Sequence, residues 1–369
     1  MSDLATVKAL RESNAQLPVH WYHEERIAAL EHRLLFNAGP GYVGHELMVP
    51  EIGDYYGLHW SGDSHVLVRS AAGVELLSNV CRHRQSTILK GRGNTKVLVC
   101  PLHRWTYGLN GKLLGAPHFP GNPCLDLDRI ALHNWNGMLF SGRRDPAFDL
   151  AKLACRADID FSGYVFDRTE VTEYQFNWKT FIEVYLEDYH VEPFHPGLNS
   201  FVDCDDLSWE FGDWYSVQTV GINRGLKRPG SPVYREWQEQ VLKFGNGKLP
   251  RFGAIWMVYY PNLMIEWYPH CLIISTLIPR GPDACSNIVE FYFPEEIALF
   301  ERDYVEAERK AYAETAYEDE VICMRMTEGR RALWRQGINE TGPYQSPMED
   351  GMRHFHEFLH RHLDPHINR

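Results

Sequence analysis

Two pairs of metal-ligand side chains stand close together in the first third of the sequence. The segment NVCRHRQSTILKGRGNTKVLVCPLHRW contains Cys81-x-His83 and, after sixteen intervening residues, Cys100-x-x-His103. Thiolates and imidazoles are common protein ligands for zinc and iron. Four of them at such short spacings predict a metal centre.

Two kinds of centre use this set of ligands. A closed set of two cysteines and two histidines is most often a structural zinc site. In zinc fingers the cysteines come first and the histidines follow, whereas here each pair holds one of each. Mixed pairs allow the two thiolates to bind one iron and the two imidazoles the other, as a Rieske [2Fe–2S] cluster requires. We favour the cluster, which Trp105 and Tyr107 can shield from water, and keep zinc as the alternative.

A second group of candidate ligands lies in FNWKTFIEVYLEDYHVEPFHPGL, residues 176–198. Glu187 and His190 are three residues apart and would share one face of a helix. His190 and His195 are separated by about 140° on a regular helix, so we expect Pro193 to break the helix and turn His195 toward His190. Two imidazoles and one carboxylate are the ligands of mononuclear non-haem iron sites that activate dioxygen. The segment therefore predicts a second metal site.

Together these motifs resemble those of the Rieske-type oxygenases, the α subunits of ring-hydroxylating and related enzymes. The family's cluster motif continues as C-x-x-H-x-W, which Cys100, His103 and Trp105 match, and the Asn177-Trp178-Lys179 lead-in is also similar. The resemblance implies a Rieske cluster, mononuclear Fe(II) and O2 as cosubstrate. It also implies electrons from a separate reductase or ferredoxin, so that NAD(P)H acts only indirectly.

The resemblance further implies roles for individual residues. The third iron ligand comes from an acidic residue on a late helix, in AYEDEVICMRM, where we choose Asp319 and keep Glu318 as the alternative. Glu187 would lie between the two metal centres of neighbouring subunits, bonded to a cluster histidine and to an iron histidine. Asn177 joins Glu187 as a candidate catalytic residue. Asp188 would face another side of the helix and is interpreted as structural.

The implied reaction is oxidation of a small organic substrate, with aromatic-ring hydroxylation as the leading class. The glutamate at position 187, where many aromatic-ring enzymes carry aspartate, resembles members that act on choline, betaine or carnitine. Monooxygenation or demethylation of such an amine is the alternative. An aromatic acid would favour an arginine in the pocket, Arg224 or Arg251, whereas a cation could use an aromatic cage. From another class, an electron-transfer protein without a functional iron and a zinc-stabilised binding protein stay open.

Strand-like runs late in the chain are rich in aromatic residues that can line such a pocket. Because side chains alternate along a strand, about half of them should point elsewhere. The aromatic residues concerned are Trp256, Tyr259, Tyr260, Trp267 and Tyr268.

Composition excludes several classes of protein. The 369-residue chain has a net charge of −12, so no basic surface for nucleic acid is expected. No run approaches the eighteen apolar residues of a membrane span. The start, MSDLATVKALRESNAQLP, lacks the apolar core of a signal peptide, which favours a cytoplasmic location. Eight cysteines in this length do not form a disulfide scaffold.

The elements that must position the two ligand sets indicate an α+β fold. A short helix over residues 20–36 is followed by short β-rich runs over about 40–145, which form an all-β unit around the first ligand set. Residues 203–250 look irregular, later strand runs suggest an antiparallel sheet, and residues 295–335 and the C-terminus look helical. The predicted domains are an N-terminal helical segment 1–36, a Rieske domain 37–155 and a catalytic iron domain 156–369. The resemblance implies a head-to-tail homotrimer.

Two further patterns are not interpreted as sites. Gly39-Pro-Gly-Tyr-Val-Gly44 matches G-x-G-x-x-G by letter, but it follows a helical pattern and precedes a strand, the reverse of a dinucleotide motif. Histidines at 354, 356, 360 and 362 spread over several faces of the last helix and are expected on its surface.

Overall fold

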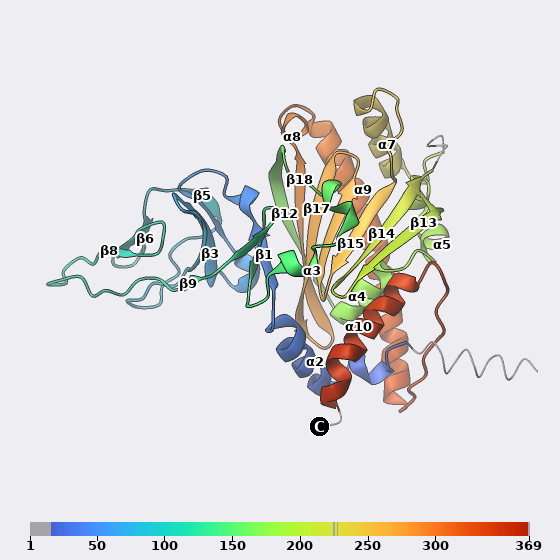
Figure 1. Cartoon of the computed structure of the whole chain (residues 1–369), viewed down its shortest axis with the longest axis horizontal. Coiled ribbons are helices and arrows are strands. Elements are labelled where there is room, and N and C mark those ends of the chain that lie inside the picture. The colour runs from blue at the N-terminus through green and yellow to red at the C-terminus, as the bar shows by residue number, and fades with distance from the viewer. Residues whose placement is uncertain (1–15, 224–225, 227, 368–369) are drawn as a thin grey trace, which may run out of the picture. The chain divides into compact units, whose positions relative to one another are not determined.

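The computed structural model describes residues 16–223, 226 and 228–367 (Figure 1). Contacts divide the chain into two compact units. The β unit is Asn37–Phe148, and the α+β unit joins the residues up to Phe36 with those from Asp149 onward. The mixed fold class is the predicted one. None of the described helices combines the length and apolarity needed to cross a membrane. The start of the chain, on which the signal-peptide prediction rests, lies outside the described residues.

The β unit is built from three small antiparallel sheets. Their strand orders are β5-β2-β3-β4-β9, β1-β11-β10 and β6-β7-β8. Two loops between these strands carry the first ligand set, one after β4 and one after β6. The strand bounds are β1 Gly41–His45, β2 Asp54–Gly57, β3 His65–Ser70, β4 Gly73–Ser78, β5 Arg92–Asn94, β6 Leu98–Val99, β7 Thr106–Tyr107, β8 Leu113–Gly115, β9 Arg129–Ile130, β10 His133–Trp135 and β11 Met138–Ser141.

The α+β unit contains a seven-stranded, fully antiparallel sheet of order β12-β18-β17-β16-β15-β14-β13. Strands β15 to β18 are buried along most of their length, which explains their nearly continuous apolar sequences. The strand bounds are β12 Tyr164–Tyr174, β13 Val202–Gly212, β14 Tyr215–Ile222, β15 Ala254–Tyr259, β16 Leu263–Tyr268, β17 Cys271–Gly281 and β18 Ala284–Pro294.

The expectation that residues 203–250 are irregular is wrong. Most of the segment forms β13, β14 and the helix α7, Pro232–Phe244. The strand β13 was missed because it is an edge strand with a mostly polar, partly exposed sequence. The start of α7 does carry a sequence signal, since Ser231 caps the helix through Tyr234 N–H and Pro232 occupies its first turn.

Helices cover the sheet and one of them, α9, runs for 34 residues along it (Figure 1). Its buried side chains pack in one core with the strand residues Phe291 and Ile273. The predicted N-terminal helix is instead a 3-10 turn, Val19–Tyr22, then α2 and a π-type turn, His32–Phe36. The remaining helices are α2 Glu25–Glu31, α3 Pro146–Asp149, α4 Trp178–Tyr185, α5 Val191–Phe194, α6 Pro196–Asn199, α8 Glu295–Phe300, α9 Arg302–Arg335 and α10 Asp350–Ile367.

A buried ionic network joins α4, α9, α10 and the N-terminal segment. The carboxylate of Glu183, which is fully buried, accepts from Arg330 (2.7 Å), from His356 (2.9 Å) and from the Tyr22 hydroxyl. Burial alone would raise the pKa of Glu183, but Arg330 and His356 lower it to about 2. The expectation that the C-terminal histidines lie on the surface is therefore wrong for His356, which is 1% exposed.

Candidate metal centres and the adjoining cavity

The two loops of the first ligand set have the same backbone geometry. In each, the cysteine carbonyl accepts from the N–H four residues later: Cys81 from Gln85 (3.0 Å) and Cys100 from Arg104 (3.1 Å). Gln85 and Arg104 both adopt left-handed backbone conformations, with φ of 54° and 61°. This repeated turn brings two equivalent Cys/His pairs to the end of the β unit.

The four side chains are arranged as a two-iron cluster needs. Both thiols are buried, whereas His103 is exposed and the rings of His83 and His103 lie 4.6 Å apart. Among the described residues, the group of three ligand atoms that lie within 4.8 Å of one another contains no cysteine. His83 Nδ1 is buried without a hydrogen-bond partner in the described part of the chain. The residues fit a Rieske cluster.

Aromatic side chains surround this set. Trp105 stacks on His83 with ring centroids 5.0 Å apart and an angle of 5°. The Tyr107 hydroxyl lies 3.4 Å from Cys81 Sγ and accepts the Arg82 N–H. Phe119, which the sequence did not single out, packs edge-on against both His83 and Trp105.

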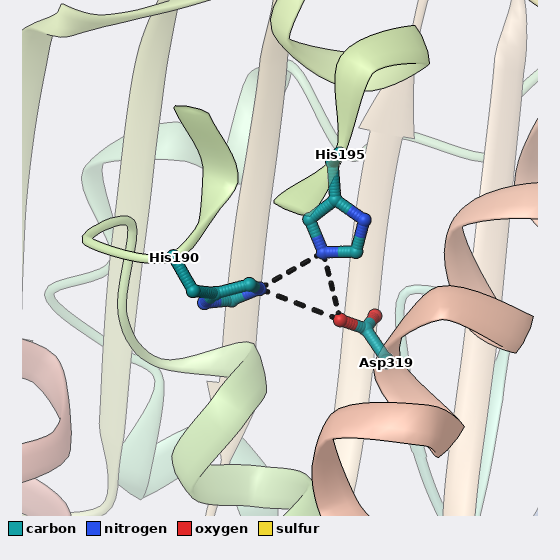
Figure 2. A group of neighbouring side chains, drawn as sticks. All are labelled: His190, His195 and Asp319. Carbon is teal, nitrogen blue, oxygen red and sulfur yellow. Dashed lines mark hydrogen bonds and ion pairs between the residues drawn. The ribbon is translucent and has the colours of Figure 1, made fainter. Parts of the chain in front are cut away.

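The second ligand set converges in the α+β unit. Figure 2 shows His190, His195 and Asp319 pointing toward one another. The Nε2 atoms of the two histidines are 2.9 Å apart, and Asp319 Oδ1 lies 3.4 Å from His190 Nε2 and 3.0 Å from His195 Nε2. Ligands at about 2.1 Å from one metal ion and at right angles to each other lie about 3.0 Å apart. The three atoms therefore fit one face of an octahedral iron site.

The chain reaches this geometry differently from the prediction. Helix α4 ends at Tyr185, so Glu187 and His190 lie in a turn rather than on a helix face. Pro193 does not break a helix but sits within the single turn of α5, where a proline is tolerated. His195 then separates α5 from α6, which redirects its side chain.

Each histidine of the triad is oriented by a second carboxylate. Glu187 Oε1 lies 2.5 Å from His190 Nδ1, and its Oε2 accepts the His190 N–H at 3.0 Å. Glu318 Oε2 lies 2.7 Å from His195 Nδ1. When Nδ1 donates to a carboxylate, the lone pair of Nε2 is free to bind a metal. Asp319 thus faces the two Nε2 atoms, whereas Glu318 contacts the Nδ1 atom on the opposite side of the His195 ring.

The charges around the triad favour a cation at its centre. Burial alone would lower the pKa of His190, but Asp319 and Glu187 raise it to about 10. Burial alone would raise the pKa of Asp319, yet the two histidines lower it. The raised pKa of His190 shows that the carboxylates of Asp319 and Glu187 favour a positive charge at this point, as a site for Fe(II) requires.

Several other candidates lie away from the triad. Asn177 caps α4 by accepting Lys179 N–H (3.0 Å), donates to two backbone carbonyls and does not line the cavity beside the triad. Its contacts are structural, so we propose no catalytic role for it. Arg251 is paired with Asp158 (3.8 Å) and also lies outside that cavity. Arg224 is outside the described residues.

A cavity that is partly open to solvent adjoins the triad. All three triad residues line it, together with Glu187. Its wall is largely aromatic and includes Tyr185, Tyr234, Trp237, Trp256, Tyr268 and Tyr312. Neither lysine nor arginine is among these lining residues. Of the strand aromatics considered above, Trp256 and Tyr268 line the cavity, and the other three do not.

Three buried carboxylates also line the cavity: Asp188, Glu266 and Glu308, each only 2–3% exposed. Burial raises the pKa of Asp188 to about 7 and that of Glu266 to about 8, and it raises the pKa of Glu308 well above its usual value. The sequence analysis missed all three as cavity residues and interpreted Asp188 as structural. A signal existed for Glu266 alone, because a charged residue interrupts the apolar strand LMIEWY.

Comparison with known proteins gives a consistent result. Residues 41–127 match the Rieske [2Fe-2S] domain, and residues 161–364 match the ring hydroxylating alpha subunit (catalytic domain). The chain is 60% identical over 364 residues to a putrescine 2-hydroxylase of Ralstonia nicotianae, covering 99% of this chain and all of that one. It is 53% identical to a putrescine 2-hydroxylase of Bordetella bronchiseptica, covering 98% and 87%. The structure of the quaternary ammonium Rieske monooxygenase CntA has the same fold, with a TM-score of 0.72, 19% identity and 94% and 95% coverage.

Proposed function

Because the chain belongs to the ring-hydroxylating α subunits of the Rieske oxygenases, we propose that it is a terminal oxygenase that hydroxylates a linear aliphatic diamine, putrescine, at C2. The observation that carries this proposal is the cavity beside the triad, which contains three buried carboxylates and neither lysine nor arginine among its lining residues. The two relatives of 60% and 53% identity support the choice of putrescine.

The cavity argues against the aromatic substrate that was the leading expectation. An aromatic hydrocarbon would leave Asp188, Glu266 and Glu308 buried against an apolar ring without a counter-charge, and a buried charge that is not paired is costly. An aromatic acid would add a further negative charge. We therefore favour a cationic substrate.

Among cations, the buried carboxylates favour primary amines. Asp188 and Glu308 are buried, and the donors beside them are neutral: the Gln218 amide and the Cys204 thiol for Asp188, and the Trp237 indole for Glu308. A primary ammonium donates three hydrogen bonds, whereas a trimethylammonium group donates none. The trimethylammonium groups of choline, betaine and carnitine could not donate a hydrogen bond to either carboxylate, so the quaternary-amine alternative is less well supported.

The roles of the residues at the iron follow from their contacts. We propose that His190, His195 and Asp319 bind Fe(II), with Glu187 and Glu318 fixing the two imidazoles. When bound, the iron supplies the activation of O2 with two electrons, so that one oxygen atom enters a C–H bond and the other leaves as water after uptake of two protons. The aromatic wall excludes bulk water from the substrate.

We further propose that electrons pass from the cluster of one subunit to the iron of its neighbour in a head-to-tail homotrimer. Exposed apolar side chains flank both centres, as subunit contacts need: Leu102 and Phe119 beside the cluster ligands and Tyr189 beside His190. Such a heterologous contact closes into a ring by rotation. Glu187, already bonded to His190, would bond a cluster histidine of the neighbour.

The bridging role can be tested with Glu187→Gln. We expect both metals to stay bound and turnover to fall strongly, because the amide cannot replace the carboxylate between the two centres. Iron content, the reduction spectrum of the cluster and single-turnover rates separate this from a loss of folding. Full activity of the variant at normal iron content would contradict the bridging role of Glu187. A monomeric mass of the wild type in light scattering would contradict the proposed trimer.

The function itself is tested with the iron-loaded enzyme and a promiscuous ferredoxin reductase. Putrescine should stimulate O2 uptake and yield a product heavier by one oxygen atom, with the hydroxyl at C2 by NMR. Betaine, choline, carnitine and benzoate serve as comparison substrates. Oxidation of any of these in preference to diamines would overturn the proposal, and cluster reduction without any substrate oxidation would favour the electron-transfer alternative.

A further inference from the structure

We propose that Glu266 and Glu308 together bind the ammonium group of the substrate that lies farther from the iron, and that this pair sets the requirement for a diamine. This inference rests on the proposed function. It assigns the discrimination between diamines and monoamines to two residues on different elements, Glu266 on β16 and Glu308 on α9.

Glu308 is a carboxylate held ready for a ligand. Its side chain is only 2% exposed, it lines the cavity, and the donor beside it is the neutral Trp237 indole rather than a cation. Burial is the main cause of the raised pKa of Glu308, and the nearby charge of Glu266 raises this pKa further. Two acidic groups that approach one another in an apolar wall are stabilised when a cation enters between them.

Glu266 is oriented toward the cavity by a chain of hydrogen bonds. The Tyr268 hydroxyl donates to its Oε2 (3.0 Å) and the Tyr312 hydroxyl to its Oε1 (3.3 Å). The Trp256 indole N–H in turn donates to Tyr268 (2.8 Å). These donors are neutral, so the carboxylate is held in place without being neutralised by a protein cation.

Along α9, Tyr312 lies between Glu308 and Asp319, which places the Glu266 region on the Glu308 side of the triad. Tyr312, which contacts Glu266, precedes Asp319 by seven residues, so both lie on one face of the helix about 10 Å apart along its axis. In putrescine the remote nitrogen lies about 4 Å beyond C2 when bonds are about 1.5 Å long. A hydrogen bond adds about 3 Å. With C2 placed against the iron site, the remote ammonium therefore extends along the cavity toward the Glu266 region.

The wall around the pair suits an ammonium group. Trp237, Trp256, Tyr268 and Tyr312 all line the cavity, and their ring faces attract a cation. The ammonium donates three hydrogen bonds, which two carboxylates can accept where a neutral end group could not use them. A monoamine such as 1-aminobutane would leave Glu308 unpaired and should bind poorly.

The test uses Glu308→Gln and Glu266→Gln in the full, iron-loaded enzyme, with Glu328→Gln as the matched control. Glu328 lies on the same helix but is exposed. Dissociation constants for putrescine and 1-aminobutane are measured by anaerobic calorimetry, and kcat/KM is measured for putrescine. Each cavity variant should weaken putrescine binding about 100-fold, since a buried charge pair is broken, and change 1-aminobutane binding by less than about threefold. The control should change neither.

The two possible failures are distinguishable. If the wild type hydroxylates putrescine but both variants keep its preference over 1-aminobutane within about threefold, the assignment of Glu266 and Glu308 is wrong and the proposed function stands. If the wild type neither binds nor oxidises any diamine, the proposed function and this inference fail together.

A conservative variant covers the case in which a glutamine variant does not fold. Glu308→Asp keeps the charge but withdraws the carboxylate by one methylene, about 1.5 Å. We expect it to retain diamine binding and to shift the preferred chain length from four carbons toward five. An unchanged preference across the three-, four- and five-carbon diamines would contradict the assignment.

Discussion

Two buried acidic regions lie on either side of the triad, and they are satisfied in opposite ways. Glu183 is surrounded by Arg330, His356 and Tyr22, and its pKa is lowered to about 2. Glu266 receives only hydroxyl groups, and its pKa is raised to about 8. The protein supplies a cation in the first region and none in the second.

The comparison of Glu183 with Glu266 shows how a structural carboxylate differs from one that is available to bind a ligand. Both are equally buried, so burial alone does not distinguish them. What distinguishes them is whether the surrounding residues neutralise the charge. Asp319 represents a third case, in which we propose that a metal ion provides the positive charge. The three regions predict different losses when the carboxylate is removed.

The largest effect is expected at the triad. Asp319→Asn should lose mononuclear iron and reduce activity to background, because a neutral amide is a much poorer ligand for Fe(II). Glu318→Gln should keep most of the iron and weaken its binding by about 10- to 100-fold, as for other residues that orient a ligand. Iron analysis after dialysis and O2 uptake measure both. Equal iron loss in the two variants would undo the distinction between ligand and supporting residue.

The next effect is on stability. Glu183→Gln leaves Arg330 buried without a counter-charge, which should cost about 3–5 kcal/mol of unfolding free energy. Tryptophan fluorescence in a urea titration reports on this unit, and Glu328→Gln provides a baseline on an exposed site of α9. A loss below about 1 kcal/mol would mean that the network is not the rigid, neutralised region described above.

The smallest effect has the opposite sign and depends on pH. Because the pKa of Glu266 rises from 4.5 to about 8 on folding, the folded state holds a proton that the unfolded state releases between these values. Wild-type stability therefore falls as pH rises from 4.5 to 8, and Glu266→Gln lacks this loss. The variant should melt at a higher temperature than the wild type at pH 8.5 and at the same temperature near pH 4.5. A variant that is less stable at pH 8.5 would show that Glu266 is already satisfied.

The candidate ligands can be selected from the sequence because their spacing is local. Cys81, His83, Cys100 and His103 are placed by two short turns, and each turn is closed by its own backbone hydrogen bonds. The choice between Asp319 and Glu318 was not available from the sequence, since one residue turns a side chain by about 100° on a helix. Only the packing of α9 against the loop that carries His195 decides which carboxylate faces Nε2.

The substrate end of the cavity depends on contacts between distant segments and was not predictable. Glu308 lies in a charge-rich helix, where a glutamate is usually exposed, and its burial follows from packing of α9 on the sheet. The helix end at Tyr185 was missed for a similar reason. The turn that follows α4 is held by backbone bonds from Asp188 to Met348 (3.1 Å) and from Met352 to Leu186 (3.1 Å), more than 150 residues away.

The 34-residue helix α9 has one consequence for how this enzyme can diversify. Glu308, Asp319 and Arg330 recur every eleven residues, which brings them back to the same side of the helix after three turns. The carboxylate proposed to bind the ammonium group, the proposed iron ligand and the structural Arg330 thus lie at fixed intervals along one helix. A substitution at position 308 can therefore change substrate specificity while Asp319 and Arg330 keep their positions. A single residue inserted between Glu308 and Asp319 would instead rotate one of them by about 100° around the helix axis, away from the other.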